Sequence, residues 1–141
     1  EEKVNVLVDT PVWSIALRRP QGAISLEEQL HEQELRGLIR ADRVVLVGAV
    51  RQELLSGIRR EAQFAMLRDR LAVFADLELR REDYEFAAEC FNRCRARGIQ
   101  GSNTDFLLCA VALRRELPIY TVDRDFNAFR RALPLALHEP G

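Results

Sequence analysis

Four acidic residues lie at the boundaries between predicted strands and helices, and they constrain the fold more than any other feature. They are Asp9, Glu53, Asp105 and Asp123. Asp9 and Asp123 directly follow predicted strands, Glu53 comes soon after another, and Asp105 opens the most apolar helix. Carboxylates gathered at one sheet edge repel one another and are costly to desolvate. A hard divalent cation such as Mg²⁺ or Mn²⁺ is the simplest compensation. The pattern therefore indicates metal-dependent phosphodiester chemistry.

The alternation of apolar runs and helical segments predicts one α/β domain over residues 1–141. Strand–helix repeats are typical of a parallel sheet with helices on both faces. About five strands are expected, at residues 4–8, 44–47, 74–79, 119–122 and 135–137, with 74–79 the weakest. The ends of parallel strands meet at one edge, so Asp9 and Asp123 are expected there together.

Local signals place the helices between these strands. Pro11 suits the first turn of a short helix, and Ser25 with Glu28 forms a capping box for a helix to about Arg40. A break near Gly57 separates helices at 49–59 and 61–73, and Gly98 is suited to end a helix over 82–97. Two further helices are expected at 104–115 and 126–133.

Composition limits the kind of protein. The 141 residues are 48% hydrophobic and 30% charged, which is typical of a globular domain. No apolar stretch reaches the roughly 20 residues of a membrane span. The three cysteines cannot all pair internally, which favours reduced thiols and a cytoplasmic location. The cysteines are Cys90, Cys94 and Cys109.

The charge of the chain does not identify a partner. The net charge is −1, and of 21 basic residues only Lys3 is a lysine. This arginine excess fits a GC-rich coding sequence, and it is also compatible with a surface that binds phosphate through guanidinium groups. The only histidines are His31 and His138, so a histidine-based acid–base mechanism is not expected.

Several polar residues near the acids have two interpretations. Asp105 is either a metal-site acid or an ordinary helix-start acid, and Asp125 is either a helix N-cap or a further metal-site acid. Ser102 is a capping or a catalytic hydroxyl, and Asn103 and Thr104 are the other candidate caps. Thr121, two residues before Asp123, is the better candidate for positioning an acid.

Four motifs in order resemble the PIN-domain ribonucleases, and among them the VapC-type toxins of type II toxin–antitoxin (VapBC) modules. The motifs are Val-Leu-Val-Asp-Thr-Pro-Val-Trp at 6–13, Val-Arg-Gln-Glu-Leu-Leu-Ser-Gly at 50–57, Gly-Ser-Asn-Thr-Asp at 101–105 and Thr-Val-Asp-Arg-Asp-Phe at 121–126. The resemblance implies a five-stranded parallel sheet and a Mg²⁺- or Mn²⁺-dependent endoribonuclease acting on structured RNA such as tRNA or rRNA. The residues that match the acidic quartet are Asp9, Glu53, Asp105 and Asp123, and Thr121 matches its accompanying hydroxyl.

The resemblance also implies partners. It implies a homodimer, and a cognate VapB-type antitoxin that inhibits the toxin in a heterotetramer or larger complex. An arginine of such an antitoxin would pair with the acids. Arg51 and Arg124 are the favoured RNA phosphate contacts because they lie within two residues of predicted site acids. The other arginines considered for this role are Arg18, Arg19, Arg59 and Arg60.

Rival α/β families fit less well. A phosphoacceptor receiver domain needs a lysine after a late strand, and a dehalogenase-type phosphatase needs an acid where this chain has Pro11. The alternative left open is a PIN-like domain that binds nucleic acid or a partner without cleaving it.

Overall fold

The computed structural model describes residues 3–17 and 25–141 and has a parallel sheet at its centre. Three strands lie in the order β2-β1-β3: β1 spans Val6–Val8, β2 Val44–Val45 and β3 Ile119–Tyr120. Both neighbours of β1 run parallel to it, with Val6 opposite Val44 and Leu7 opposite Ile119. The predicted α/β class and parallel sheet are confirmed.

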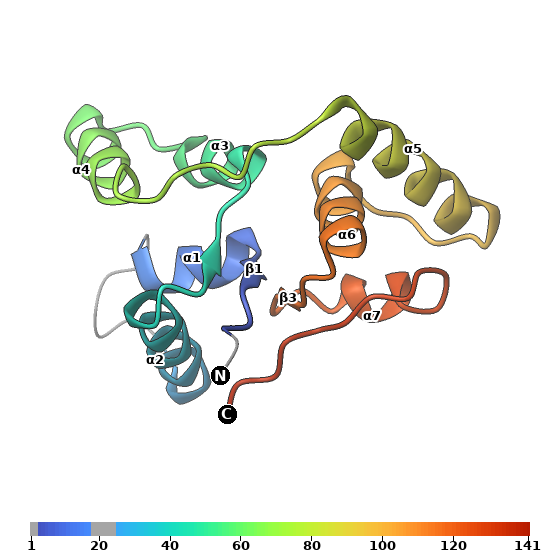
Figure 1. Cartoon of the computed structure of the whole chain (residues 1–141). Helices are drawn as coiled ribbons and strands as arrows, with labels where there is room; N and C mark the ends of the chain where they lie inside the picture. The colour runs from blue at the N-terminus through green and yellow to red at the C-terminus, as the bar shows by residue number, and fades with distance from the viewer. Residues whose placement is uncertain (1–2, 18–24) are drawn as a thin grey trace.

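Seven helices occur within the described residues, close to the predicted segments: α1 Thr10–Leu17, α2 Leu26–Arg40, α3 Gly48–Leu55, α4 Glu61–Leu71, α5 Arg81–Ala96, α6 Asn103–Arg115 and α7 Asp125–Phe129. Figure 1 shows α1 to α4 on the β2 side of the sheet and α5 to α7 on the β3 side. Helices therefore flank the sheet.

The helix boundaries follow the predicted local signals. Ser25 caps α2: its hydroxyl accepts a hydrogen bond from the Glu28 backbone N–H, and the Glu28 carboxylate accepts one from the Ser25 backbone N–H. Gly57, with φ of 84°, lies between α3 and α4, and Gly98, with φ of 74°, follows α5. Glycine adopts these positive φ values without the strain that a Cβ atom adds.

Two of the five expected strands are present only as single bridges. Residue Asp76 pairs with Leu46, and Leu137 pairs with Ile119, both in parallel. These bridges lie on the outer sides of β2 and β3, where the expected strands at 74–79 and 135–137 would complete a five-stranded sheet. The edge segments gain ladder hydrogen bonds on one side only, and most of residues 72–80 are exposed, so little burial supports longer pairing.

The core surrounds β1 and α6. All three residues of β1 are fully buried, as is Trp13 of α1. Seven consecutive residues of α6 are buried, from Phe106 to Ala112. A helix buried all round is held in place by its neighbours on every side, which positions the acid at its start.

The cysteines belong to this core. Cys90, Cys94 and Cys109 are all buried and free of disulfides. Burial raises the pKa of the Cys90 thiol to about 11, so this group stays protonated near neutral pH. In the described part of the chain, none of the helices has the length and apolar character that crossing a bilayer requires.

Candidate active site

Asp9 lies at the C-terminal end of β1 and is only 4% exposed. Its backbone N–H donates to the Tyr120 carbonyl oxygen at 2.9 Å, which fixes it to β3. Its carboxylate accepts two hydrogen bonds, from the Thr10 backbone N–H to Oδ1 at 2.8 Å and from the Thr121 hydroxyl to Oδ2 at 2.7 Å. The acid is therefore held in one orientation inside the domain.

Thr121 joins two of the predicted site acids. Its hydroxyl oxygen donates to Asp9 and accepts from the Asp123 backbone N–H at 3.0 Å. The expected association of Thr121 with Asp123 is therefore a hydroxyl–backbone contact, whereas its side-chain partner is Asp9. Its place one residue after β3 makes both contacts possible.

Asp123 shapes the turn that leads into α7. Its Oδ1 atom accepts from the Asp125 backbone N–H at 2.9 Å, and its carbonyl oxygen accepts from Phe126 N–H at 3.3 Å. Asp125 is thus the first residue of α7, preceded by Arg124 at the cap position, and the N-cap interpretation of Asp125 is wrong. Asp123 satisfies a free amide of this helix start instead.

Asp105 belongs to the first turn of α6 and is half-buried. Ser102 is the N-cap: its hydroxyl accepts from Asp105 N–H, and the Ser102 N–H donates to Asp105 Oδ2, both at 3.0 Å. Asp105 therefore has the helix-start role considered for it. Ser102 bonds Oδ2, so this capping box is compatible with a cation on the remaining oxygen.

Glu53 is exposed near the end of α3, and one hydrogen bond directs it toward β1. The Thr10 hydroxyl donates to Glu53 Oε1 at 2.6 Å across 43 residues of sequence. Because Thr10 directly follows Asp9 in the chain, this bond holds Glu53 close to the Asp9 backbone.

The four acids lie close enough to influence one another. Burial raises the pKa of Asp9 from 3.8 to about 6, against the lowering effect of Thr121 and Thr10, and the charges of Asp105 and Asp123 raise it further. Burial also raises the pKa of Asp105, where Asp123 and Glu53 add their repulsion. The tertiary structure thus brings the predicted quartet together around Asp9.

The donor set fits a hard divalent cation. The four groups supply carboxylate oxygens, which Mg²⁺ and Mn²⁺ prefer. A cation would also relieve the repulsion and desolvation that raise the pKa of Asp9. Within residues 3–17 and 25–141, however, no three Asp, Glu, His or Cys side chains already converge at metal-ligand geometry. The four acids therefore lie near one another without forming a complete metal-coordination site.

The two favoured arginines differ in their surroundings. Arg51 donates to Asp76 Oδ1 at 2.8 Å, the Leu71 carbonyl at 2.9 Å and the Phe74 carbonyl at 2.5 Å. These three bonds connect α3 to the end of α4 and to the segment after it, and they occupy the guanidinium. Arg124 is exposed beside Asp123 and lines a cavity of about 220 Å³ with Thr121. Arg59 and Arg60 are exposed, while Arg18 and Arg19 lie outside the described residues.

One neighbouring network could not be anticipated from the sequence. His31 Nδ1 lies 2.6 Å from the Tyr120 hydroxyl, and the His138 ring lies 5.1 Å from the Tyr120 ring. His138 Nε2 lies 2.7 Å from Glu34 Oε2. Both histidines thus contact Tyr120, the last residue of β3, although they are 107 positions apart in sequence and no motif connects them.

Comparison with known proteins identifies the domain. A family model described as PIN domain matches residues 6–132, which is most of the chain. The chain therefore belongs to the PIN domain family, as the four motifs predicted. No curated protein matches it by sequence.

Solved structures share the fold. FitAcB from Neisseria gonorrhoeae superposes with a TM-score of 0.73 at 23% identity, covering 96% of this chain and 97% of that one. VapBC2 from Rickettsia felis, bound to a DNA fragment from its promoter, gives a TM-score of 0.73 at 16% identity, covering 96% and 98%. FitAB bound to the IR36 DNA fragment gives 0.72 at 23% identity, covering 96% and 94%. At these identities the likeness shows the fold.

Proposed function

We propose that this PIN domain is a Mg²⁺- or Mn²⁺-dependent endoribonuclease and the toxin of a type II toxin–antitoxin module. The observation that supports this most directly is Asp9: a carboxylate that is 4% exposed, held by two hydrogen bonds and surrounded by further acids. Burying an unpaired carboxylate destabilises the fold, and a bound cation would compensate its charge.

The acids would hold the cation, and nearby residues would hold the acids. Asp9, Asp105, Glu53 and Asp123 are the proposed ligands. When bound, the cation would neutralise negative charge on the scissile phosphate and lower the pKa of an attacking water. Thr121 fixes the rotamer of Asp9, and Thr10 directs Glu53 toward the same region. These hydroxyls limit the movement of the ligands, which otherwise repel one another.

The proposed substrate is structured RNA, such as tRNA or rRNA, cut within a single-stranded loop. The bases of a single-stranded loop are unstacked and can be recognised by a protein surface, whereas the deep, narrow major groove of an RNA helix cannot be read by side chains. Arg124 is the proposed phosphate contact because it is exposed next to Asp123. We do not extend this role to Arg51, since its guanidinium already binds three protein oxygens.

The proposed partner is a VapB-type antitoxin. The neighbours VapBC2 and FitAB are two-component complexes solved with DNA fragments, which supports an analogous complex here. An antitoxin arginine would pair with the acid quartet in place of the cation. We further propose a homodimer, a heterotetramer or larger complex with antitoxin, and a cytoplasmic location, where such RNA substrates are found.

Cleavage of total cellular RNA by the purified protein tests the enzyme. Discrete products with Mg²⁺ or Mn²⁺, lost with EDTA and in Asp9→Asn, are expected. Asp69→Asn, an exposed acid of α4, is the matched control and keeps activity. Growth arrest on expression, relieved by Asp9→Asn, tests the toxin. Metal-dependent cleavage without growth arrest would refute the proposed toxin function but would still support the nuclease activity.

The alternative is a PIN-like module that binds nucleic acid or a partner without cutting. The absence of a preformed three-ligand cluster among the described residues is the observation that favours it. Thermal unfolding separates the two functions, because a ligand that binds only the folded state raises the melting temperature. A rise with Mn²⁺ that is absent in Asp9→Asn supports the enzyme, and no rise supports the binding module.

A further inference from the structure

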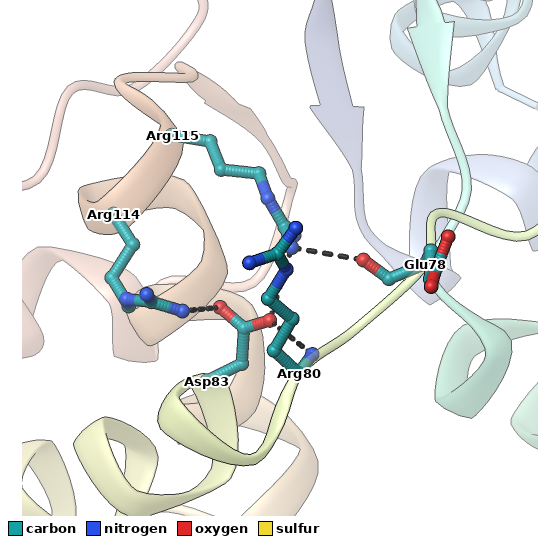
Figure 2. Close-up of polar contacts among 5 residues, drawn as sticks. All are labelled: Glu78, Arg80, Asp83, Arg114 and Arg115. Carbon is teal, nitrogen blue, oxygen red and sulfur yellow. Dashed lines mark hydrogen bonds and ion pairs between the residues drawn. The ribbon is translucent and has the colours of Figure 1, made fainter.

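A second charged cluster lies at the far end of α6 from the acid quartet (Figure 2). Asp83, in the first turn of α5, is completely buried and binds two arginines from the last turn of α6. Its Oδ1 lies 2.5 Å from Arg114 Nη1, and its Oδ2 lies 3.0 Å from Arg115 Nη2. The Arg80 backbone N–H also donates to Oδ2, at 2.7 Å. No sequence motif marks these residues.

Asp83 is fully occupied by these contacts. Burial acts to raise the pKa of Asp83, but the Arg80 N–H and the two guanidinium groups outweigh it and keep the pKa low. The single negative charge therefore remains ionised, and it faces more than one positive charge. One carboxylate cannot neutralise Arg114 and Arg115 together.

Two hydrogen-bonding groups of this cluster lack protein acceptors. Arg115 Nη1 is buried and has no hydrogen-bond partner, although Nη2 of the same side chain bonds Asp83 and the Glu78 carbonyl. Arg80 is exposed, and among the described residues its guanidinium, which Figure 2 shows extending toward Arg115, forms no hydrogen bond or ion pair and is open to a ligand from solvent. Buried donors are nearly always satisfied, so an unpaired one points to a missing acceptor.

A cavity adjoins these arginines. Glu78, Arg80, Arg114 and Arg115 line one cavity of about 360 Å³. Three features act against an anion there: the Asp83 carboxylate, the Glu78 carboxylate and the negative end of the α6 dipole. The three guanidinium charges still exceed the two carboxylate charges, and guanidinium forks match the oxygens of a phosphate group well.

We propose that Arg80, Arg114 and Arg115 form a second binding site that takes a phosphate group, and that RNA backbone supplies it. The choice of RNA rests on the proposed function. Asp105 and Arg115 lie ten residues apart on α6, which is about 15 Å along the helix. A phosphate at this site therefore belongs to a part of a folded RNA away from the cleaved bond. The site would add affinity for structured substrates without touching the chemistry.

Inorganic phosphate tests the site without any need for activity. We expect phosphate, compared with chloride at equal ionic strength, to raise the melting temperature of the wild-type protein by a few degrees. Arg80→Gln should lose most of this rise, because Arg80 contributes a guanidinium that no protein group holds. Arg81→Gln is the matched control: Arg81 is the next residue, its side chain is 82% exposed, and it forms a loose ion pair with Glu82 at 3.8 Å. No rise in the wild-type protein, or an equal rise in Arg80→Gln, would overturn the site.

RNA binding tests the source of the phosphate. In an Asp9→Asn background, which prevents cleavage, Arg80→Gln should weaken binding of folded tRNA about ten-fold and lower the salt-dependence slope by about one. Arg81→Gln should leave both unchanged. Loss of the phosphate response with unchanged RNA affinity would make free phosphate the ligand and overturn the RNA assignment. A protein that binds phosphate here but never cleaves RNA would refute the proposed nuclease and leave the site standing.

Discussion

The Thr121 hydroxyl donates a 2.7 Å hydrogen bond to Asp9 Oδ2, joining two residues that are 112 positions apart in sequence. Asp9 ends β1 and Thr121 follows β3, and these strands are neighbours in the sheet. The contact therefore depends on correct parallel pairing. The contact also fixes the orientation of the Asp9 carboxylate, a proposed ligand of the cation, so folding of the sheet assembles the site.

Replacing this hydroxyl should weaken both the site and its activity. Thr121→Val keeps the shape of the side chain but removes the donor to Asp9 and the acceptor for Asp123 N–H. We expect RNA cleavage to fall about 10- to 100-fold, with a weaker apparent affinity for Mn²⁺. Thr121→Ser, which restores the hydroxyl, should recover most activity. Wild-type Mn²⁺ affinity in Thr121→Val would show that the hydroxyl does not position Asp9.

The raised pKa of Asp9 should make the metal-free protein less stable as pH rises. Below about pH 4, Asp9 is protonated in the folded and unfolded states and adds no difference. Between about 4 and 6 the unfolded chain releases its proton first, so the folded state loses stability through this window and stays lower above it. A shift of about two units corresponds to roughly 3 kcal/mol.

Urea unfolding in EDTA at pH 4.5, 6 and 7.5 measures this effect. Asp9→Asn removes the titrating group, so its stability should change much less across the same range. Parallel pH profiles for the two proteins would show that Asp9 titrates normally.

Substitution of Gly101 should disturb the start of α6. A Cβ atom there would lie 2.6 Å from Phe129 Cζ and 3.0 Å from Phe106 Cε2. Because both rings are buried, they cannot yield freely, and we expect Gly101→Ala to cost about 1–3 kcal/mol. Cleavage should also fall, since Gly101 directly precedes the Ser102 cap that holds Asp105.

Gly37→Ala is the control for this substitution. Gly37 lies inside α2, and apart from the local backbone of its own helix nothing lies within 4 Å of the added Cβ, so alanine should stabilise the helix by about 0.5–1 kcal/mol. Chemical denaturation of both variants gives the comparison. Equal stabilisation by the two changes would contradict the steric argument.

Loss of Asp83 should be far more damaging than loss of an exposed acid. Asp83→Asn leaves Arg114 and Arg115 without their buried counter-charge, which typically costs about 3–5 kcal/mol. Asp69→Asn breaks only an exposed contact with Arg68, so its effect should stay within about 0.5 kcal/mol. Comparable denaturation midpoints would mean that Asp83 does not hold α5 against α6.

Most of the fold could be predicted because its signals are local. The Ser25–Glu28 capping box, the break at Gly57 and the helix end at Gly98 depend on residues within a few positions of one another. The two edge strands were over-predicted as continuous ladders, because strand length depends on burial against distant partners. Of the two interpretations of Asp125, the N-cap is wrong for a related reason: Asp123 accepts the hydrogen bond from the Asp125 N–H at the start of α7.

The sequence by itself determined which carboxylates stand at the ends of strands and the start of α6, because strand and helix periods are properties of short segments. Only the tertiary structure decided which groups meet. It brings the Thr121 hydroxyl to Asp9 and the Thr10 hydroxyl to Glu53. It also engages Arg51 in a structural contact with Asp76 and places Arg115 beside Asp83. Such contacts join residues dozens of positions apart, and their strength depends on burial. Neither the pairing nor its strength can therefore be read from a local sequence pattern.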